Sequence, residues 1–155
     1  MSGVDWSRVT AAIGLAQQGQ TDQGRAALEA CWAASDEGDH AVRCVVAHYL
    51  ADLQSELDEE IAWDERALVE LPHLRDEDVT GLGVESAAGF APSLHLNLGD
   101  GYLRRGDTAA ARHHLEQGRA SLGALGEDAY GVMVRRGFDR LAARIESPTA
   151  LPRRR

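Results

Sequence analysis

Four residues able to bind a metal ion or transfer a proton recur at every fourth position in one stretch of the chain. They are His40, Cys44, His48 and Asp52. Side chains four positions apart lie on one face of an α-helix, so His48 and Asp52 could hold a metal ion or orient an imidazole. No HExxH or comparable second ligand motif accompanies them. A hydrogen-bonded pair beside a small, packed cysteine is therefore the favoured interpretation.

Other residue types that serve catalysis lack the context that catalysis needs. His113 and His114 lie between charged residues, which predicts a solvated helical face. Gly81-x-Gly83 has no preceding strand and no third glycine at the spacing of a dinucleotide-binding loop. The serines occur in neither a GxSxG nor an SxxK context. We expect no catalytic residue, no metal ion and no cofactor.

The composition is that of an acidic chain whose charge is unevenly distributed. Its 155 residues are 44% hydrophobic and 26% charged, as in an ordinary folded domain, and the net charge is −9. Residues 1–103 hold 19 acidic residues and 5 arginines, whereas residues 104–155 hold 6 and 11. The overall charge disfavours general binding to nucleic acid, while the basic second part could meet an acidic partner.

The cysteines and the hydropathy pattern bear on localisation. Cys31 and Cys44 show no CxxC spacing, which predicts small buried residues in a reducing compartment. The polar N-terminal segment shows no signal-peptide pattern, and no apolar run reaches transmembrane length. We therefore expect a cytoplasmic protein with no membrane partner.

Apolar residues recur at helical spacing along most of the chain, which predicts about seven α-helices. Thr21 or Asp22 could cap the second of them, and Ser55-Glu56-Leu57-Asp58 resembles a capping box at the start of the fourth. The expected helices span about residues 5–18, 21–35, 39–53, 57–71, 92–105, 108–125 and 128–145.

Residues 72–91 interrupt this regular pattern. Pro72 ends one helix, and Pro92 suits the first turn of the next. The segment between them holds a run of charged residues and three glycines. A structureless loop of this length is unusual inside a compact domain, so we expect a short helix near Val84–Gly89.

The best-defined unit is a pair of helices joined by a tight turn. Its characteristic positions are Leu98-Gly99, Tyr102, Gly106-Asp107, Ala111 and Leu115. With these positions, residues 94–122 resemble a tetratricopeptide repeat (TPR), a helix–turn–helix unit of about 34 residues. Gly118 stands where that family prefers alanine, and His95 stands where a large apolar residue is usual.

Two weaker copies of the unit precede it, over residues 8–34 and 43–69. The resemblance implies an all-α fold in which antiparallel helix pairs stack as a short right-handed superhelix. We expect a single domain over residues 1–146 that ends in a capping helix with a polar back. Its parts are repeats over about 5–35, 39–71 and 92–125, an insertion at 72–91, a capping helix at 128–145 and a flexible basic tail at 147–155.

The resemblance also implies where a partner would bind. In TPR arrays the first helix of each pair lines a concave groove. This assigns to the groove Cys44, His48 and Asp52 from the second repeat and Asn97, Asp100 and Arg104 from the third. Asn97 matches an asparagine with which one branch of the family holds a peptide's terminal carboxylate, but the chain has no lysine to complete that site. General binding of a peptide or protein is therefore favoured.

The expected function is that of a non-catalytic cytoplasmic scaffold that binds a peptide or protein partner. Two alternatives stay open. The chain could be a small-molecule-binding protein or an enzyme, with residues 72–91 as a lid over the groove. It could also be a homo-oligomeric structural subunit that associates through its acidic first part and its basic second part.

Overall fold

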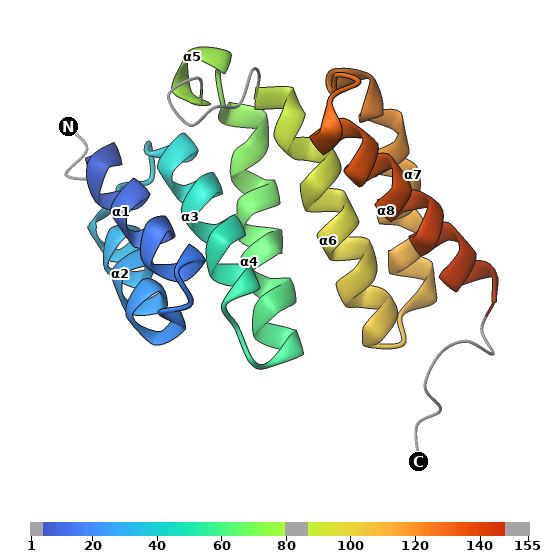
Figure 1. Cartoon of the computed structure of the whole chain (residues 1–155), viewed down its shortest axis with the longest axis horizontal. Helices are drawn as coiled ribbons and strands as arrows, with labels where there is room; N and C mark the ends of the chain where they lie inside the picture. The colour runs from blue at the N-terminus through green and yellow to red at the C-terminus, as the bar shows by residue number, and fades with distance from the viewer. Residues whose placement is uncertain (1–4, 80–86, 148–155) are drawn as a thin grey trace. The chain divides into compact units, whose positions relative to one another are not determined.

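The computed structural model describes residues 5–79 and 87–147, and every regular element in these two ranges is helical (Figure 1). The predicted all-α fold class is confirmed. Eight α-helices are described instead of about seven, because the predicted insertion contributes the short helix α5. The α-helices are α1 (Trp6–Gln17), α2 (Thr21–Ala34), α3 (His40–Asp52), α4 (Leu57–Glu70), α5 (Asp76–Val79), α6 (Phe90–Arg104), α7 (Thr108–Ala120) and α8 (Ala129–Glu146). The short 3-10 helices are η1 (Leu71–His73), η3 (Ala87–Gly89) and η4 (Leu122–Ala124).

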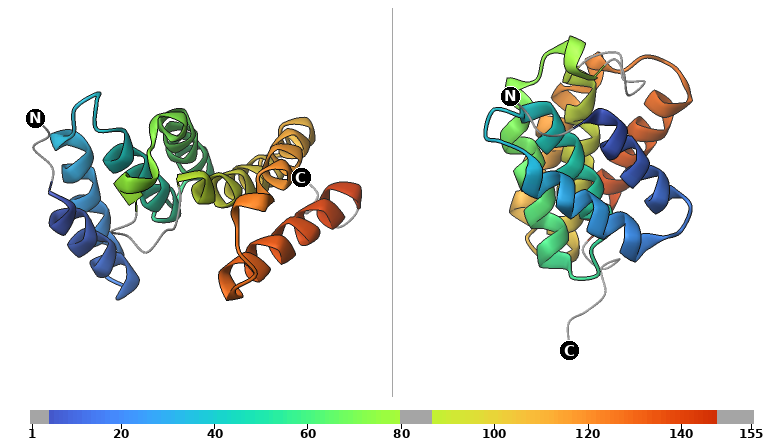
Figure 2. Two further views of the ribbon diagram at one scale, coloured as in Figure 1. Left: turned by 90° about the horizontal axis from the view of Figure 1, so that it is seen from above. Right: turned by 90° about the vertical axis from the view of Figure 1, so that its left-hand side faces the viewer.

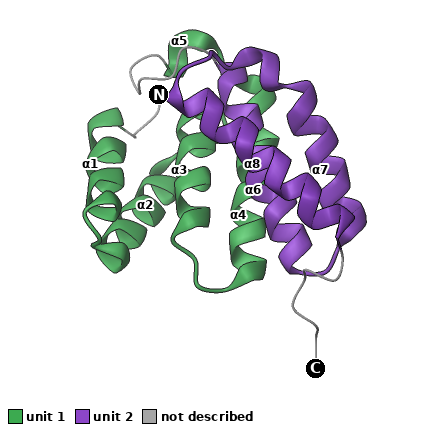
Figure 3. Cartoon of the chain, turned by 45° about the vertical axis from the view of Figure 1, so that its right-hand side comes forward, with its two compact units in different colours: residues 1–79 green, residues 80–155 purple. Residues whose placement is uncertain are grey.

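The chain divides into two compact units, residues 1–79 and 80–155 (Figure 3). The first unit contains the hairpins α1–α2 and α3–α4, followed by η1 and α5. The second contains the hairpin α6–α7, against which α8 packs; Figure 2 shows the helices of each unit from two further sides. The boundary between the units falls inside the predicted insertion. A single domain over residues 1–146 stays a prediction.

The predicted insertion and tail are described only in part. The helices η1 and α5 lie at the start of the predicted insertion. The short helix predicted near Val84–Gly89 lies outside the described residues except for its end, which forms η3. The predicted basic tail lies outside them beyond Ser147.

Two glycines make the tight turns of the hairpins α1–α2 and α6–α7. Gly19 has a φ of 83° and Gly106 a φ of 89°, a left-handed conformation that costs other residues free energy. After Gly106, the Asp107 carboxylate accepts a hydrogen bond from the Ala110 N–H at 3.0 Å and so caps α7. The turn predicted at Gly106-Asp107 is confirmed.

Two predicted helix caps are wrong. The helix α2 begins at Thr21 itself, and Gln20 before it makes no side-chain capping bond. At α4, Glu56 occupies the capping position, again without a side-chain bond, so the predicted capping box does not form. Both helices instead carry acidic residues in their first turn, where the helix dipole favours negative charge.

The core of the first unit is built from small and aliphatic side chains. Val9, Leu28, Val46 and Leu50 are fully buried. The Arg25 guanidinium also donates from Nε to the carbonyl oxygen at the end of α3, at 3.1 Å. The two hairpins of this unit are therefore joined by packing and by a hydrogen bond from the Arg25 side chain to a backbone carbonyl.

In the second unit, α8 packs on α6 and α7 through Phe138, which is fully buried. A Cβ atom added to Gly118 on α7 would lie 2.2 Å from Phe138 Cζ. The aromatic ring thus occupies the space that a side chain at position 118 would need. This contact explains why glycine stands where the TPR family prefers alanine.

Candidate binding surfaces on the first helices

The three predicted groove residues of α3 differ widely in exposure. Cys44 is fully buried, and desolvation, assisted by the carboxylates of Glu70 and Asp64, raises the pKa of its thiol to about 12. The His48 side chain is 14% exposed, whereas Asp52 is exposed at the end of the helix. In this structure Cys44 is a core residue, so His48 and Asp52 provide the surface of α3 at this site.

His48 has a partner on the facing helix. Its Nδ1 lies 3.2 Å from Oδ1 of Asp64 on α4, whose side chain is 2% exposed. Burial raises the pKa of Asp64 to about 6, against the lowering effect of the hydrogen bond from His48. Desolvation also raises the pKa of Asp52, the partner expected from the sequence. The structure thus contains a hydrogen-bonded histidine beside a packed cysteine, with Asp64 in the role predicted for Asp52.

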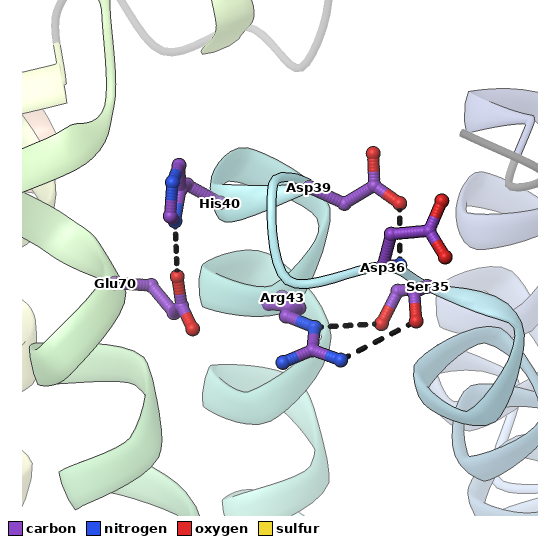
Figure 4. Close-up of polar contacts among 6 residues, drawn as sticks. All are labelled: Ser35, Asp36, Asp39, His40, Arg43 and Glu70. Atoms are coloured by element: carbon purple, nitrogen blue, oxygen red, sulfur yellow. Dashed lines mark hydrogen bonds and ion pairs between the residues drawn. The ribbon is translucent and has the colours of Figure 1, made fainter. Parts of the chain in front are cut away.

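Polar contacts fasten the turn between α2 and α3 (Figure 4). Arg43 donates from Nε to the Ser35 hydroxyl at 2.9 Å and from a terminal nitrogen to the Ser35 carbonyl at 3.3 Å. The same guanidinium lies over the Trp32 ring, 4.9 Å from its centroid. Within the turn, the Asp36 N–H donates to the Asp39 carboxylate at 2.7 Å. These contacts fix the position at which α3 begins.

At that end of α3, two imidazole rings lie beside a pocket. His40 Nδ1 is 2.6 Å from Glu70 Oε2 (Figure 4), and the His40 ring stacks on that of His73 at 4.3 Å. The pocket has a volume of about 470 Å³. Its lining residues are Trp6, Gly38, Asp39, His40, Ala41, Val42, His73, Arg75 and Asp78. Three of these come from the start of the predicted insertion.

On α6 of the second unit, two of the three predicted groove residues form an ion pair. Asp100 accepts from Arg104 at 2.8 Å and from Arg144 of α8 at 2.7 Å. Asn97, the third, is half-buried one turn earlier. Two guanidinium groups, from α6 and from α8, therefore meet at one carboxylate. No spacing in the sequence indicated Arg144, because it comes from another helix.

A histidine pair lies between α6 and α7. Nδ1 of His95 is 3.0 Å from Nδ1 of His114, and Tyr102 stacks on the His114 ring at 5.5 Å. Because two ring nitrogens share this bond, one must donate and the other accept. His114 is 6% exposed, so the predicted solvated face is wrong for His114 and correct for the exposed His113. The unusual His95 was the only signal of this pair in the sequence.

Two further kinds of site, a metal centre and a membrane-spanning helix, are not found in the described parts of the chain. Within residues 5–79 and 87–147, no three histidine, cysteine or acidic side chains are arranged to hold a metal ion. None of the described helices combines the length and the apolar character needed to cross a membrane.

Comparisons with known proteins agree with the hairpin geometry. A family model described as tetratricopeptide repeat matches residues 6–30 and 92–117. The first match covers α1 and most of α2, and the second covers most of α6 and most of α7. No curated protein and no solved structure matches the chain.

Proposed function

Because this chain is a tetratricopeptide repeat protein and hence a protein-interaction module, we propose that it binds a peptide or protein partner in a concave groove. The first helices of its repeats would line the groove. The observation that carries the proposal is that both matched segments fold as complete helical hairpins, α1–α2 and α6–α7. The half-buried side chains of α3 and α6, together with Asp52 and Arg104, the exposed residues of these two helices, then supply the contacts.

Each unit, considered by itself, offers charged side chains on one of these helices. On α3, the exposed Asp52 lies beside His48, which is hydrogen-bonded to the buried Asp64. These carboxyl groups favour a basic segment of the bound protein. On α6, the cluster of Asp100 with two arginines favours a carboxylate or another acidic group.

We further propose that the protein acts in the cytoplasm as a scaffold without catalytic activity. Cys31 and Cys44 are both free and buried, which is the usual state of cysteines in a reducing compartment. Their burial also keeps them from serving as exposed nucleophiles.

The proposed groove can be tested by site-specific photo-crosslinking. A photo-reactive amino acid at Asp52 or at Asn97 is expected to give adducts with a partner, which mass spectrometry identifies. The same amino acid at Glu59 on α4 or Gln117 on α7, which are exposed positions on second helices, is the matched control. With the partner purified, reversing the charge of Arg104 by Arg104→Glu is expected to weaken binding about tenfold, the effect of one charged hydrogen bond.

Adducts from the second-helix positions but not from Asp52 or Asn97 would contradict groove binding. A partner whose affinity is unchanged by Arg104→Glu would exclude the charged cluster of α6 from the interface.

The pocket at the start of α3 supports a second candidate function, the binding of a small molecule. Its volume of about 470 Å³ lies within the range of ligand sites, and His40 and His73 line it as stacked rings. A ligand-observed NMR screen with small polar metabolites is expected to find a binder whose affinity falls at least about tenfold in His73→Ala. His113→Ala, at an exposed histidine of α7, is the matched control. A binder that both variants affect equally, or no binder, would exclude this function.

A further inference from the structure

Exposed apolar side chains gather at the start of α8. In the two described ranges, four large hydrophobic side chains are exposed, and the one outside α8 is Val69. The three on α8 are Tyr130, Val132 and Met133, at 44%, 41% and 57% exposure. The opposite side of the helix buries Phe138 in the core. The prediction that the side of this capping helix facing away from the core is polar is therefore wrong for its first turns.

Two arginines continue this surface along the helix. Arg136 and Arg140 follow Met133 at spacings of three and four, so the three side chains share one face. Both arginines are exposed, and neither has an ion pair or hydrogen bond with the described residues. The other two arginines of α8 are engaged, one with backbone carbonyls of the preceding turn and one with the carboxylate of Asp100. Val132, Met133, Arg136 and Arg140 are called the outer face of α8 below.

We propose that the outer face of α8 binds an acidic amphipathic helix of a partner protein. Its apolar end matches aliphatic side chains of such a helix. Its two guanidinium groups, which have no ion pair with the described residues, match carboxylates one and two turns further along the partner's helix. Helix-on-helix packing is also the way in which helical repeats cover their neighbours. This surface is distinct from the α3 and α6 residues of the proposed function, so either proposal can fail alone.

The charge of the outer face disfavours other occupants. In a two-fold contact, the outer face of α8 in one copy would lie against the outer face of α8 in the other. This would bring the arginines of both copies together. An anionic membrane would gain only about 1 kcal/mol from each arginine, and stable anchoring takes more than one weak signal. An acidic helix neutralises both arginines and covers the apolar end in the same contact.

The test uses a designed fluorescent peptide that forms a helix with leucines on one face and glutamates on both sides of them. A matched peptide has lysine at every glutamate position. In fluorescence anisotropy with the full chain, the acidic peptide is expected to bind and the lysine peptide is not. The combined substitution Met133→Glu and Arg136→Glu is expected to lower the affinity at least about tenfold. Raising the salt from about 0.01 M to about 0.15 M is also expected to lower it, because the Debye length falls from about 30 Å to about 8 Å.

Two matched controls change an exposed arginine and an exposed apolar residue elsewhere. Arg112→Glu on α7 and Val69→Glu on α4 alter exposed side chains outside the outer face and are expected to leave the affinity unchanged. All variants should keep the helical circular dichroism signal, since every substituted side chain is exposed. Equal losses in the controls, or equal binding of the lysine peptide, would overturn the proposal. Two further results would also overturn the proposal. One is a dimer, seen in sedimentation, that the combined α8 substitution abolishes. The other is binding to phosphatidylserine vesicles, without binding to the acidic peptide, that the same substitution abolishes.

Discussion

Replacing Gly118 by alanine is expected to lower the free energy of unfolding by about 1–3 kcal/mol, although alanine is the better helix former. The added Cβ atom would lie 2.2 Å and 2.4 Å from two ring atoms of Phe138 and 3.0 Å from Cβ of His95. Because Phe138 is fully buried, its ring cannot move into solvent. Urea unfolding followed by circular dichroism measures the loss as a lower midpoint at an unchanged slope.

The matched control is Gly14→Ala, the same substitution within α1. A Cβ atom at Gly14 has no neighbour within 4 Å, so helix propensity alone decides the effect. This variant is expected to gain about 0.5–1 kcal/mol. Opposite signs at the two positions would isolate the steric contact at Gly118 from the general preference for alanine in helices.

A double-mutant cycle identifies Phe138 as the cause. Phe138→Leu alone should destabilise the second unit, because it leaves a cavity in the core. Combined with Gly118→Ala, it should cost less than the sum of the two single losses, since the shorter side chain makes room for the new methyl group. Strictly additive losses would mean that the ring does not limit the space at position 118.

The same contact illustrates how much of the fold could be predicted from the sequence. The helices and the Gly106-Asp107 turn depend on residues close together in the chain, so periodicity and turn chemistry predicted them. The need for glycine at position 118 could not be predicted, because it arises from the ring of Phe138, which belongs to another helix and fills the space of a side chain there. The spacing of apolar residues predicts that Phe138 is buried but not which residue it meets.

The candidate sites were harder to predict for the same reason. Spacing along α3 suggested Asp52 as the partner of His48, whereas Asp64 on α4 accepts the hydrogen bond. Charged neighbours suggested that His114 is solvated, whereas His95 on α6 bonds its ring. Each error concerns a side chain that pairs across a helix interface, where the approach of two helices decides the partner and spacing within one helix does not.

The second large effect is expected at Asp64, where Asp64→Asn should stabilise the protein near pH 7 by up to about 3 kcal/mol. Burial raises the pKa of this carboxyl from 3.8 to about 6, so between these values the folded state binds more protons than the unfolded state. Its contribution to stability is therefore present at low pH and is lost as the pH rises through about 6. Asparagine carries no charge and keeps an oxygen that can accept the hydrogen bond from His48.

Urea unfolding across this pH range separates the charge of Asp64 from other effects. The native protein should lose stability as the pH rises from about 4 to about 7, and Asp64→Asn should lose much less. Some slope should remain in the variant, because desolvation also raises the pKa of Asp52. Glu59→Gln, which removes an exposed carboxylate from the same helix, is the matched control and should follow the native profile. A lower stability of Asp64→Asn near pH 7 would contradict this prediction. It would mean that the ionised carboxylate gains more stability from its contact with His48 than its burial costs. Asp64 would then stabilise the α3–α4 hairpin as an ion pair with His48.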